Sequence, residues 1–508
     1  MVFYKNNFNE NLVIKIRFFF IFILLISFLF QILIDFQDLQ NIYISTISLL
    51  ITLIIFQTIF RKEILINSFI PVLVILFSNL GYLSGPLVIK SLFFQKISEN
   101  LIFPLETFNL IFLFQLCLFI SFLIFFHLIV KKRSVSREKK TDFLKIFEVV
   151  DKKNFIIMVF IFSVLKIYVW ILNNGIVDST EFSNIKFKFF FGIQIFFYIP
   201  LIIYMKSYFF EKNISKNKLF FLIILYFFAG IIFSILSNTR TYFYEFFLIL
   251  GIFYLILFIF SNFTIKNKAF LFLSCIFLIF IINSLNNMII STRYLKEELK
   301  PLELLKFSFS QRQEVDYLET WEGDEYYTGN ITVDRFIFPK FVDKSISLTH
   351  NFQEFQIEQY KKFLLSKIIY TIPQNVIHMF DKTYFKERFA MSSGSYQERL
   401  NGIKKGNYSQ GSNIVDIQII FEKYSFLIFI SYYVIFFSFI QIFQKNEKDK
   451  IEISFLILLL AIPITRISVD DSASGYLSNL RIFIEVILFN FVLIRLFNYF
   501  NKKNKLLR

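Results

Sequence analysis

Long apolar blocks alternate with short polar connections along most of the chain. The blocks hold roughly 18–22 residues each with almost no charge inside them, which is the length of helix that crosses the hydrocarbon core of a bilayer. Twelve such blocks occur, at residues 17–34, 42–60, 66–84, 109–130, 154–173, 189–210, 219–236, 242–261, 269–289, 424–443, 451–468 and 480–499. The pattern predicts an all-α fold, a polytopic bundle of about twelve transmembrane helices.

One long polar segment interrupts this rhythm. It covers residues 291–423, and a connection of that length inside a membrane protein is usually functional or partly folded. We therefore expect three regions. Residues 1–290 carry spans one to nine with short loops, residues 291–423 form a large loop, and residues 424–508 carry spans ten to twelve and a basic tail.

The large loop contains helical patterns of its own. In "NFQEFQIEQYKKFLLSKII" (351–369) apolar and aromatic side chains recur at approximately helical spacing; they are Phe352, Phe355, Tyr360, Phe363 and Leu364. Lysines lie between them, which suits a helix on the membrane surface. A helix packed against the rest of its own loop fits the same pattern, and the sequence leaves both interpretations open.

Lysine and arginine in the short connections predict the orientation. With the N-terminus inside, the inside segments include "KKRSVSREKKTDFLKIFEVVDKK" (131–153) and the tail "NKKNKLLR". The short outside loops then hold only Lys90, Lys96, Lys186, Lys188 and Arg240. Both termini are predicted to be cytoplasmic and the large loop extracytoplasmic. The apolar run 18–34 is too long for a signal-peptide core and is expected to be an uncleaved first span.

Composition agrees with a membrane protein and limits what the charge means. The 508 residues are 56% hydrophobic and include 77 phenylalanines, and the mean hydropathy is +0.60, beyond what a soluble domain needs. The net charge is +16, but residues 292–423 hold 18 Lys+Arg and 18 Asp+Glu, a balance of zero. The excess therefore lies mostly on cytoplasmic connections, where it reports orientation and contact with anionic membrane lipid. Nucleic-acid binding is not implied.

The cysteines and histidines give little indication of a metal site or a disulfide. Cys117 and Cys275 both lie inside apolar blocks without a CxxC neighbour, and His127, His350 and His378 include no pair at metal-ligand spacing. We expect neither a metal nor a cofactor.

Two arginines stand out because positive charge is scarce on the predicted outer side. Arg240, in "ILSNTRTYFYEFF" (235–247), precedes the eighth span, and Arg293, in "IISTRYLKEELK" (289–300), follows the ninth. Each could extend to a lipid phosphate as an interfacial anchor. Together they could bind a lipid-linked diphosphate, because the guanidinium group matches phosphate oxygens bidentately.

The return of the large loop to the membrane carries acidic candidates. "GSNIVDIQIIFEKYSFLIFISYYVIF" (411–436) places Asp416 and Glu422 before the tenth span. A carboxylate there could act as general base on a sugar hydroxyl, or it could be a solvated acidic residue favoured at a helix start. His378 could serve as acid or base or could simply hydrogen-bond.

Two external loops add charged candidates. "RISVDDSASGYLSNLR" (466–481) contains Arg466, Asp470, Asp471 and Arg481, which could pair with one another or line an active site. The first external loop, "DFQDLQ" (35–40), contains Asp35 and Asp38. Many membrane glycosyltransferases carry an acidic pair in that loop, but theirs is long and this one is short.

Taken together, the plan resembles the O-antigen or oligosaccharide repeat-unit polymerases of bacterial envelopes, the Wzy type. Topology carries the resemblance: about a dozen spans with one large extracytoplasmic loop in the C-terminal half. "SNTRTYFYEFF" is similar to the family's arginine-containing external turn, and "GSNIVDIQIIFEKYSF" resembles its return from the loop, with Asp416 in the acidic position. The chain departs by having Lys423-Tyr424-Ser425 where a glycine is common, and it lacks the His-Asn signature of the related ligases.

The resemblance implies a metal-independent glycosyltransferase of polysaccharide or lipopolysaccharide biosynthesis. It would lie in the bacterial cytoplasmic (inner) membrane and act on undecaprenyl-diphosphate-linked oligosaccharides, with room for a chain-length regulator as a partner. The expected roles are diphosphate binding by Arg240 and Arg293, with Arg481 and Arg466 second, and general base catalysis by Asp416, with His378 second.

Two rival functions share parts of this architecture. An O-antigen ligase would transfer finished polymer to a lipid acceptor. A flippase for lipid-linked units also has about twelve spans, but its loops are short and its halves repeat. The large loop and the absence of a visible repeat argue against the flippase.

Overall fold

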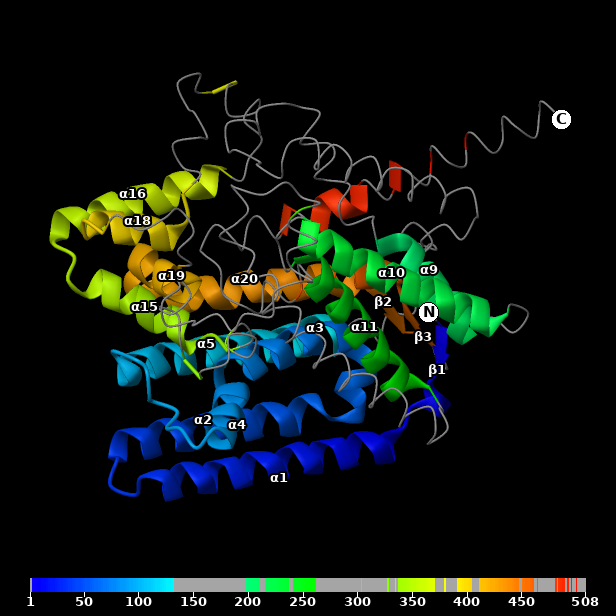
Figure 1. The fold of residues 1–508 in the computed structure, drawn as a ribbon, viewed down its shortest axis with the longest axis horizontal. Coiled ribbons are helices and arrows are strands. Elements are labelled where there is room, and N and C mark those ends of the chain that lie inside the picture. Colours follow the sequence, from blue (N-terminus) through cyan, green and yellow to red (C-terminus); the bar gives the residue numbers. More distant parts are fainter. Residues whose placement is uncertain are drawn as a thin grey trace.

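The structure is a computed structural model of the chain. It describes residues 2–131, 198–210, 215–236, 241–261, 337–370, 391–403, 411–446 and 450–460, with shorter stretches such as 327–328, 379–380, 480–481 and 483–488 and a few single positions. Helices make up most of these residues (Figure 1). In the first half they are α1 (Glu10–Ile34), α2 (Leu39–Ile59), α3 (Lys62–Asn79), α4 (Gly85–Leu92), α5 (Pro104–Phe125), α9 (Ile199–Phe210), α10 (Lys216–Leu236) and α11 (Thr241–Phe260). In the second half they are α15 (Pro339–His350), α16 (Glu354–Tyr370), α18 (Ser393–Leu400), α19 (Asn413–Phe421), α20 (Ser425–Ile440) and α21 (Leu456–Leu459).

The described residues are mostly helical, as predicted, and they include helices that could span a membrane. Five stretches are long and apolar enough to cross a bilayer: Glu10–Ile34, Leu39–Ile59, Lys62–Leu92, Pro104–Lys131 and Asn413–Phe443. They coincide with the spans predicted at 17–34, 42–60, 66–84, 109–130 and 424–443, and α9 to α11 are apolar helices on three more. The spans predicted at 154–173 and 269–289 lie outside the described residues, so the number twelve stays a prediction.

The third span is the most enclosed of the five. Its most apolar window is 78% buried, whereas that of α1 is only 17% buried. Two breaks interrupt its helical hydrogen bonds. Ser68 has non-helical dihedrals (φ −145°, ψ 40°) just before Pro71, and a π-helical turn separates α3 from α4 at Leu80–Ser84. Proline removes a helical hydrogen bond and π-turns widen the helix, so each break frees backbone groups.

Distant parts of the chain fill both breaks. At the first, the Gln444 side chain accepts from the Phe69 N–H at 2.9 Å and donates to the Ile66 carbonyl at 2.6 Å. At the second, the Phe338 N–H donates to the Gly81 carbonyl at 3.0 Å. The Phe338 ring lies where a Cβ on Gly81 would be, 2.1 Å from that position. Buried backbone groups need partners, and here the partners tie the third span to the C-terminal half.

A small sheet departs from the all-α expectation. Its strands β1 (Val2–Tyr4), β2 (Gln444–Asn446) and β3 (Lys450–Ile453) pair antiparallel in the order β1-β3-β2, with Phe3 opposite Ile451. The span predicted to begin at 451 is therefore corrected, because its first three residues lie in β3. Lys450 to Ile453 alternate polar and apolar residues, the period of a strand with one buried face, and the N-terminal strand supplies the edge that they pair with.

Contacts between connections divide the bundle into two ends. Lys62 and Glu10 form an ion pair at 2.6 Å at the end that carries the sheet. At the opposite end, the α1–α2 turn contacts the segment after α4, and helices α15, α16, α18 and α19 gather there (Figure 1). The loops grouped at each end are those that the charge pattern assigns to one side of the membrane.

Candidate active site

The candidate site lies where the large polar segment meets the helix that returns to the membrane. Helices α15 and α16 of that segment pack against α19, which leads into α20, and α18 packs on α15 and α16 (Figure 1). The membrane helix thus begins at Asn413, earlier than the predicted 424, because α19 and α20 are joined by a single tight turn.

The sequence starts α19 with a capping serine. The Ser412 side chain accepts from the Val415 N–H, and the Asp416 N–H donates to the Ser412 carbonyl at 2.8 Å. Asp416 therefore lies in the first turn, where the helix dipole favours a carboxylate. Gly411, just before the cap, contacts α18 so closely that a Cβ would lie 2.9 Å from the Gly394 nitrogen.

Asp416 is the predicted base, and it lies inside a polar network. The Tyr360 hydroxyl of α16 donates to Asp416 Oδ1 at 2.6 Å, and Gln397 Nε2 of α18 donates to the same hydroxyl at 2.8 Å. Ser345 of α15 exchanges hydrogen bonds with the Gln397 amide at 2.8 and 3.1 Å. Asp416, Tyr360 and Gln397 are each 0% exposed. Four elements far apart in sequence thus converge on one carboxylate.

The direction of the Tyr360–Asp416 hydrogen bond follows from electrostatics. Burial, and after it the charge of Asp416, raises the pKa of Tyr360 well above its usual range. Tyrosine therefore keeps its proton and acts as donor, and Asp416 acts as acceptor.

Aromatic rings enclose the network. Phe352, Tyr360, Phe363 and Leu364 form one buried cluster against α18 and α19. The Phe363 and Tyr396 rings stack at a centroid distance of 3.9 Å. The apolar stripe predicted in 351–369 thus packs largely on its own segment, although Phe355 is 57% exposed. Apolar walls strengthen the hydrogen bonds that they enclose.

Ion pairs join the same helices at the rim. Lys361 Nζ of α16 lies 2.7 Å from Glu422 Oε1, and Lys344 Nζ of α15 lies 3.3 Å from Glu398 Oε1. Glu422 has a φ of 49° in the turn between α19 and α20. This left-handed conformation favours glycine.

The remaining predicted site residues fall in two groups. Arg481 is described: its Nε lies 2.6 Å from Glu485 Oε1, one turn along the same helix. Arg240, Arg293, Arg466 and His378 lie outside the described residues. The described residues therefore place Asp416 in a defined environment and leave the predicted grouping of arginines as a prediction.

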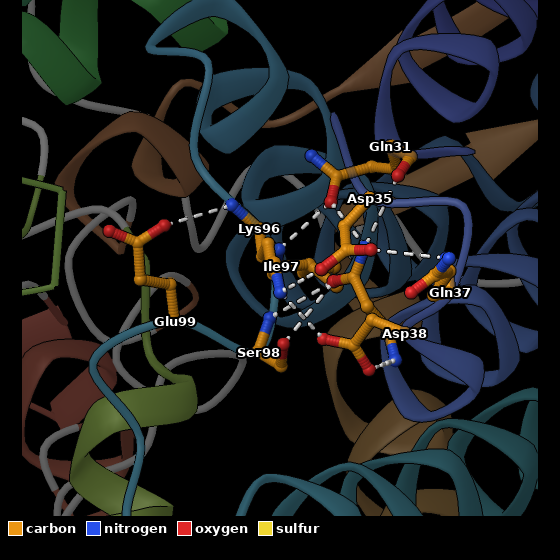
Figure 2. A network of polar contacts seen from close by, with 9 residues as sticks. Gln31, Asp35, Gln37, Asp38, Lys96, Ile97, Ser98 and Glu99 are labelled. Atoms are coloured by element: carbon orange, nitrogen blue, oxygen red, sulfur yellow. Dashed lines mark hydrogen bonds and ion pairs between the residues drawn. The ribbon is translucent and has the colours of Figure 1, made fainter. Parts of the chain in front are cut away.

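The acidic pair of the α1–α2 turn has a different environment (Figure 2). Lys96 Nζ lies 2.6 Å from Asp35 Oδ2 and 3.1 Å from Asp38 Oδ2. Asp38 also caps α2 through the Asn41 N–H, while buried Gln31 accepts from the Ile97 N–H. The hydrogen bond from Lys96 holds the pKa of Asp35 below its usual range. These contacts fasten the α1–α2 turn to the segment after α4.

Sequence reasoning missed Gln397 and Ser345, and it assigned Tyr360 only to an apolar stripe. Neutral polar residues outside the spans give no signal of their own, because their partners lie 37 to 56 positions away. Within the described part of the chain, no three His, Cys, Asp or Glu side chains gather as a metal site. Comparison of the chain with protein families, curated proteins and solved structures finds no match.

Proposed function

We propose that the chain is a membrane glycosyltransferase that polymerises undecaprenyl-diphosphate-linked oligosaccharide units on the outer face of the cytoplasmic membrane. The observation that carries the proposal is Asp416. It is a carboxylate held as a hydrogen-bond acceptor at one end of a membrane helix bundle, beneath folded helices of a large polar segment. A base in that position can meet the sugar of a lipid-linked substrate whose tail lies in the bilayer.

The reaction assigns a role to each candidate. A hydroxyl of a new lipid-linked unit attacks the anomeric carbon of the growing chain, while Asp416 takes the hydroxyl proton. The bond between that carbon and the diphosphate oxygen breaks, and undecaprenyl diphosphate leaves. Arg240 and Arg293 are proposed to stabilise the charge that develops on the leaving group; Arg481 and Arg466 are the second candidates for this role, and His378 is the second candidate for the base.

The burial of Asp416 adds a requirement to this proposal. Because its side chain has no exposed surface, the acceptor hydroxyl reaches Asp416 only after a local opening of the site, one that leaves the Tyr360 hydroxyl on Oδ1. The exposed Lys361–Glu422 ion pair contributes little stability, because solvent screens it. An opening at this rim therefore costs little free energy from that pair.

The glycan profile of a deletion strain separates the proposed function from its rivals. Loss of a polymerase leaves a single repeat unit on the surface lipid. Loss of a ligase leaves finished polymer on undecaprenyl diphosphate, and loss of a flippase leaves neither product outside. We expect the first pattern, and either of the others contradicts the proposal.

Complementation of that strain tests the proposed roles. Asp416→Asn should lower polymer formation by roughly 10²–10⁴-fold, the usual contribution of a general base. Glu422→Gln, which neutralises a nearby carboxylate, should leave polymer formation unchanged. Arg240→Ala should shorten the chains and Arg240→Lys should restore them only in part, because lysine lacks the bidentate fork. Full chain length with Arg240→Ala, at normal expression, contradicts diphosphate binding by Arg240.

A further inference from the structure

Asp416 is held by a side chain that the sequence does not mark as functional. The 2.6 Å hydrogen bond from Tyr360 fixes Oδ1 of the carboxylate, and Tyr360 is itself fixed in two ways. Gln397 donates to its hydroxyl at 2.8 Å, and its ring lies among Phe352, Phe363 and Tyr396 at centroid distances of 5.9 to 6.4 Å. The hydroxyl therefore has one direction in which to donate.

We propose that Tyr360 is the positioning residue of Asp416: it sets the plane of the carboxylate so that the acceptor hydroxyl meets a base in the right orientation. This inference rests on the proposed function. Proton transfer needs heavy atoms within about 2.6–3.2 Å, and a misplacement of about 1 Å in a site can lower a rate about 10²-fold. The hydrogen bond from Tyr360 to Oδ1 limits rotation of the carboxylate about its own bond.

Gln397 and Ser345 support Tyr360 from further along the hydrogen-bond network. Gln397 contacts Tyr360 directly, and Ser345 contacts Gln397. Gln397 donates to both Tyr360 and Ser345, so it holds the hydroxyl that donates to the carboxylate. The chain of contacts runs from α15 through α18 and α16 to α19. Its order predicts a graded response, with the largest effect at Tyr360, a smaller one at Gln397 and the smallest at Ser345.

A purely structural Tyr360 would behave differently from a positioning one. A structural residue changes how much of the protein is folded, but the turnover of each folded molecule stays the same. A positioning residue lowers kcat while KM stays nearly constant, because the interaction matters in the transition state and not for holding the lipid-linked substrate. The split between kcat and KM therefore separates the two roles.

The test uses the full chain in lipid nanodiscs. The substrate is undecaprenyl-diphosphate-linked oligosaccharide isolated from a strain in which the gene for this protein is deleted. Tyr360→Phe removes one oxygen and keeps the ring in its cluster. Tyr396→Phe is the matched control, since its ring stacks in the same cluster and its hydroxyl lies outside the described network. Rates are measured per folded molecule, with thermal unfolding of every variant measured in parallel.

We expect Tyr360→Phe to lower kcat about 10–100-fold with KM within about twofold, and Tyr396→Phe to leave both unchanged. Unchanged kcat in Tyr360→Phe, or an equal loss in both variants, overturns the positioning role while the polymerase proposal stands. Failure of the wild-type chain to form polymer overturns the proposed function itself, so the two failures are distinct. A rise in KM at constant kcat assigns Tyr360 to substrate binding and also overturns the inference.

Discussion

At the scale of single residues, backbone geometry explains several identities that composition does not. Gly411 lies against the first turn of α18, and Gly81 lies against the Phe338 ring. Glu422 holds a backbone conformation that suits glycine. These positions lie where the large polar segment joins the apolar helices. Substitutions there therefore test the packing of that junction.

Replacing Gly411 with alanine should destabilise the protein. The added Cβ would lie 1.9 Å from Ser393 Oγ and 2.9 Å from the Gly394 nitrogen, and because the second neighbour is backbone, the N-terminus of α18 must move. Overpacking of this kind costs about 1–3 kcal/mol. Thermal unfolding measures the change. Gly230→Ala is the control, since a Cβ there meets nothing within 4 Å; equal behaviour of the two variants contradicts the tight contact.

Replacing Glu422 with glycine should separate backbone strain from the ion pair. A non-glycine residue in a sparsely populated conformation costs about 1–3 kcal/mol, so Glu422→Gly relieves strain while it loses the exposed contact with Lys361. Glu422→Gln loses the same contact and keeps the strain. We expect the glycine variant to unfold at a higher temperature than the glutamine variant. The reverse order means that the turn is not strained.

At the scale of elements, helix ends are satisfied by side chains from other parts of the chain. The N-cap residue of α5, Phe103, makes no side-chain cap of its own. Asp343 of α15 takes that place, accepting from the N–H groups of Ile102 and Phe103 at 2.8 and 2.7 Å and from the Thr107 hydroxyl at 3.1 Å. The start of a membrane span is thus completed by the polar segment.

Removing that tertiary cap should weaken α5. Asp343→Ala loses all three hydrogen bonds and leaves two partly buried N–H groups and one buried hydroxyl without this acceptor, at a cost of about 1–3 kcal/mol. Asp343→Asn keeps one carbonyl oxygen and should lose less. Thermal unfolding gives the order of stability, which we expect to be wild type, then asparagine, then alanine. A wild-type unfolding temperature in the alanine variant contradicts the capping role.

The contact between the α1–α2 turn and the segment after α4 should depend on pH (Figure 2). The hydrogen bond from Lys96 lowers the pKa of Asp35 below its usual 3.8. Its contribution to stability is therefore present above that value and is lost as the pH falls through the lower folded pKa. The pKa of Lys96 is raised above 10.5 by the same partners, so its contribution is lost only in strong alkali.

Lys96→Met tests this dependence. The difference in unfolding temperature between wild type and Lys96→Met should be nearly constant around neutral pH and should shrink below about pH 4, where Asp35 becomes protonated. Lys362→Met, which removes an exposed lysine of α16, controls for the loss of one positive charge. A difference between wild type and Lys96→Met that is equal at pH 3 and pH 6 contradicts the role of the ion pair.

At the scale of the whole molecule, the two ends of the bundle carry different structures. One end holds the three-stranded sheet that joins the N-terminus to residues 444–453. The other holds the helices around Asp416 (Figure 1). Charge in the connections predicts that the sheet end is cytoplasmic, and the proposed reaction requires the Asp416 end to face outward.

Cysteine labelling tests that assignment in a variant without Cys117 and Cys275. Phe36→Cys, at a position 76% exposed in the α1–α2 turn, should react with an impermeant maleimide on intact spheroplasts. Tyr4→Cys, at a position 53% exposed in β1, should react only after the membrane is opened. Reversed labelling contradicts both the predicted orientation and the proposed function.

The fold was predictable where one physical effect dominates. Uncharged blocks of span length had to be helices, because the backbone in lipid must satisfy its own hydrogen bonds. The spans predicted at 17–34 and 109–130 accordingly lie within described helices, and the span predicted at 42–60 extends one residue past α2. The start of β3 was missed, since its alternation is only four residues long and its partner strand is at the other end of the chain. Asp416 stays a predicted site residue, chosen because it lies where the large polar segment meets the next apolar helix.

The sequence by itself determined that the chain is mostly helical and where most of the described apolar helices lie, because the bilayer acts on each segment independently of the others. Only the tertiary structure decided that Gln444 and Phe338 complete the third span, that Asp343 caps α5 and that Tyr360 holds Asp416. Each of those contacts joins residues far apart along the chain. They form because a buried polar group must find a partner, and which partner it finds depends on how the helices pack.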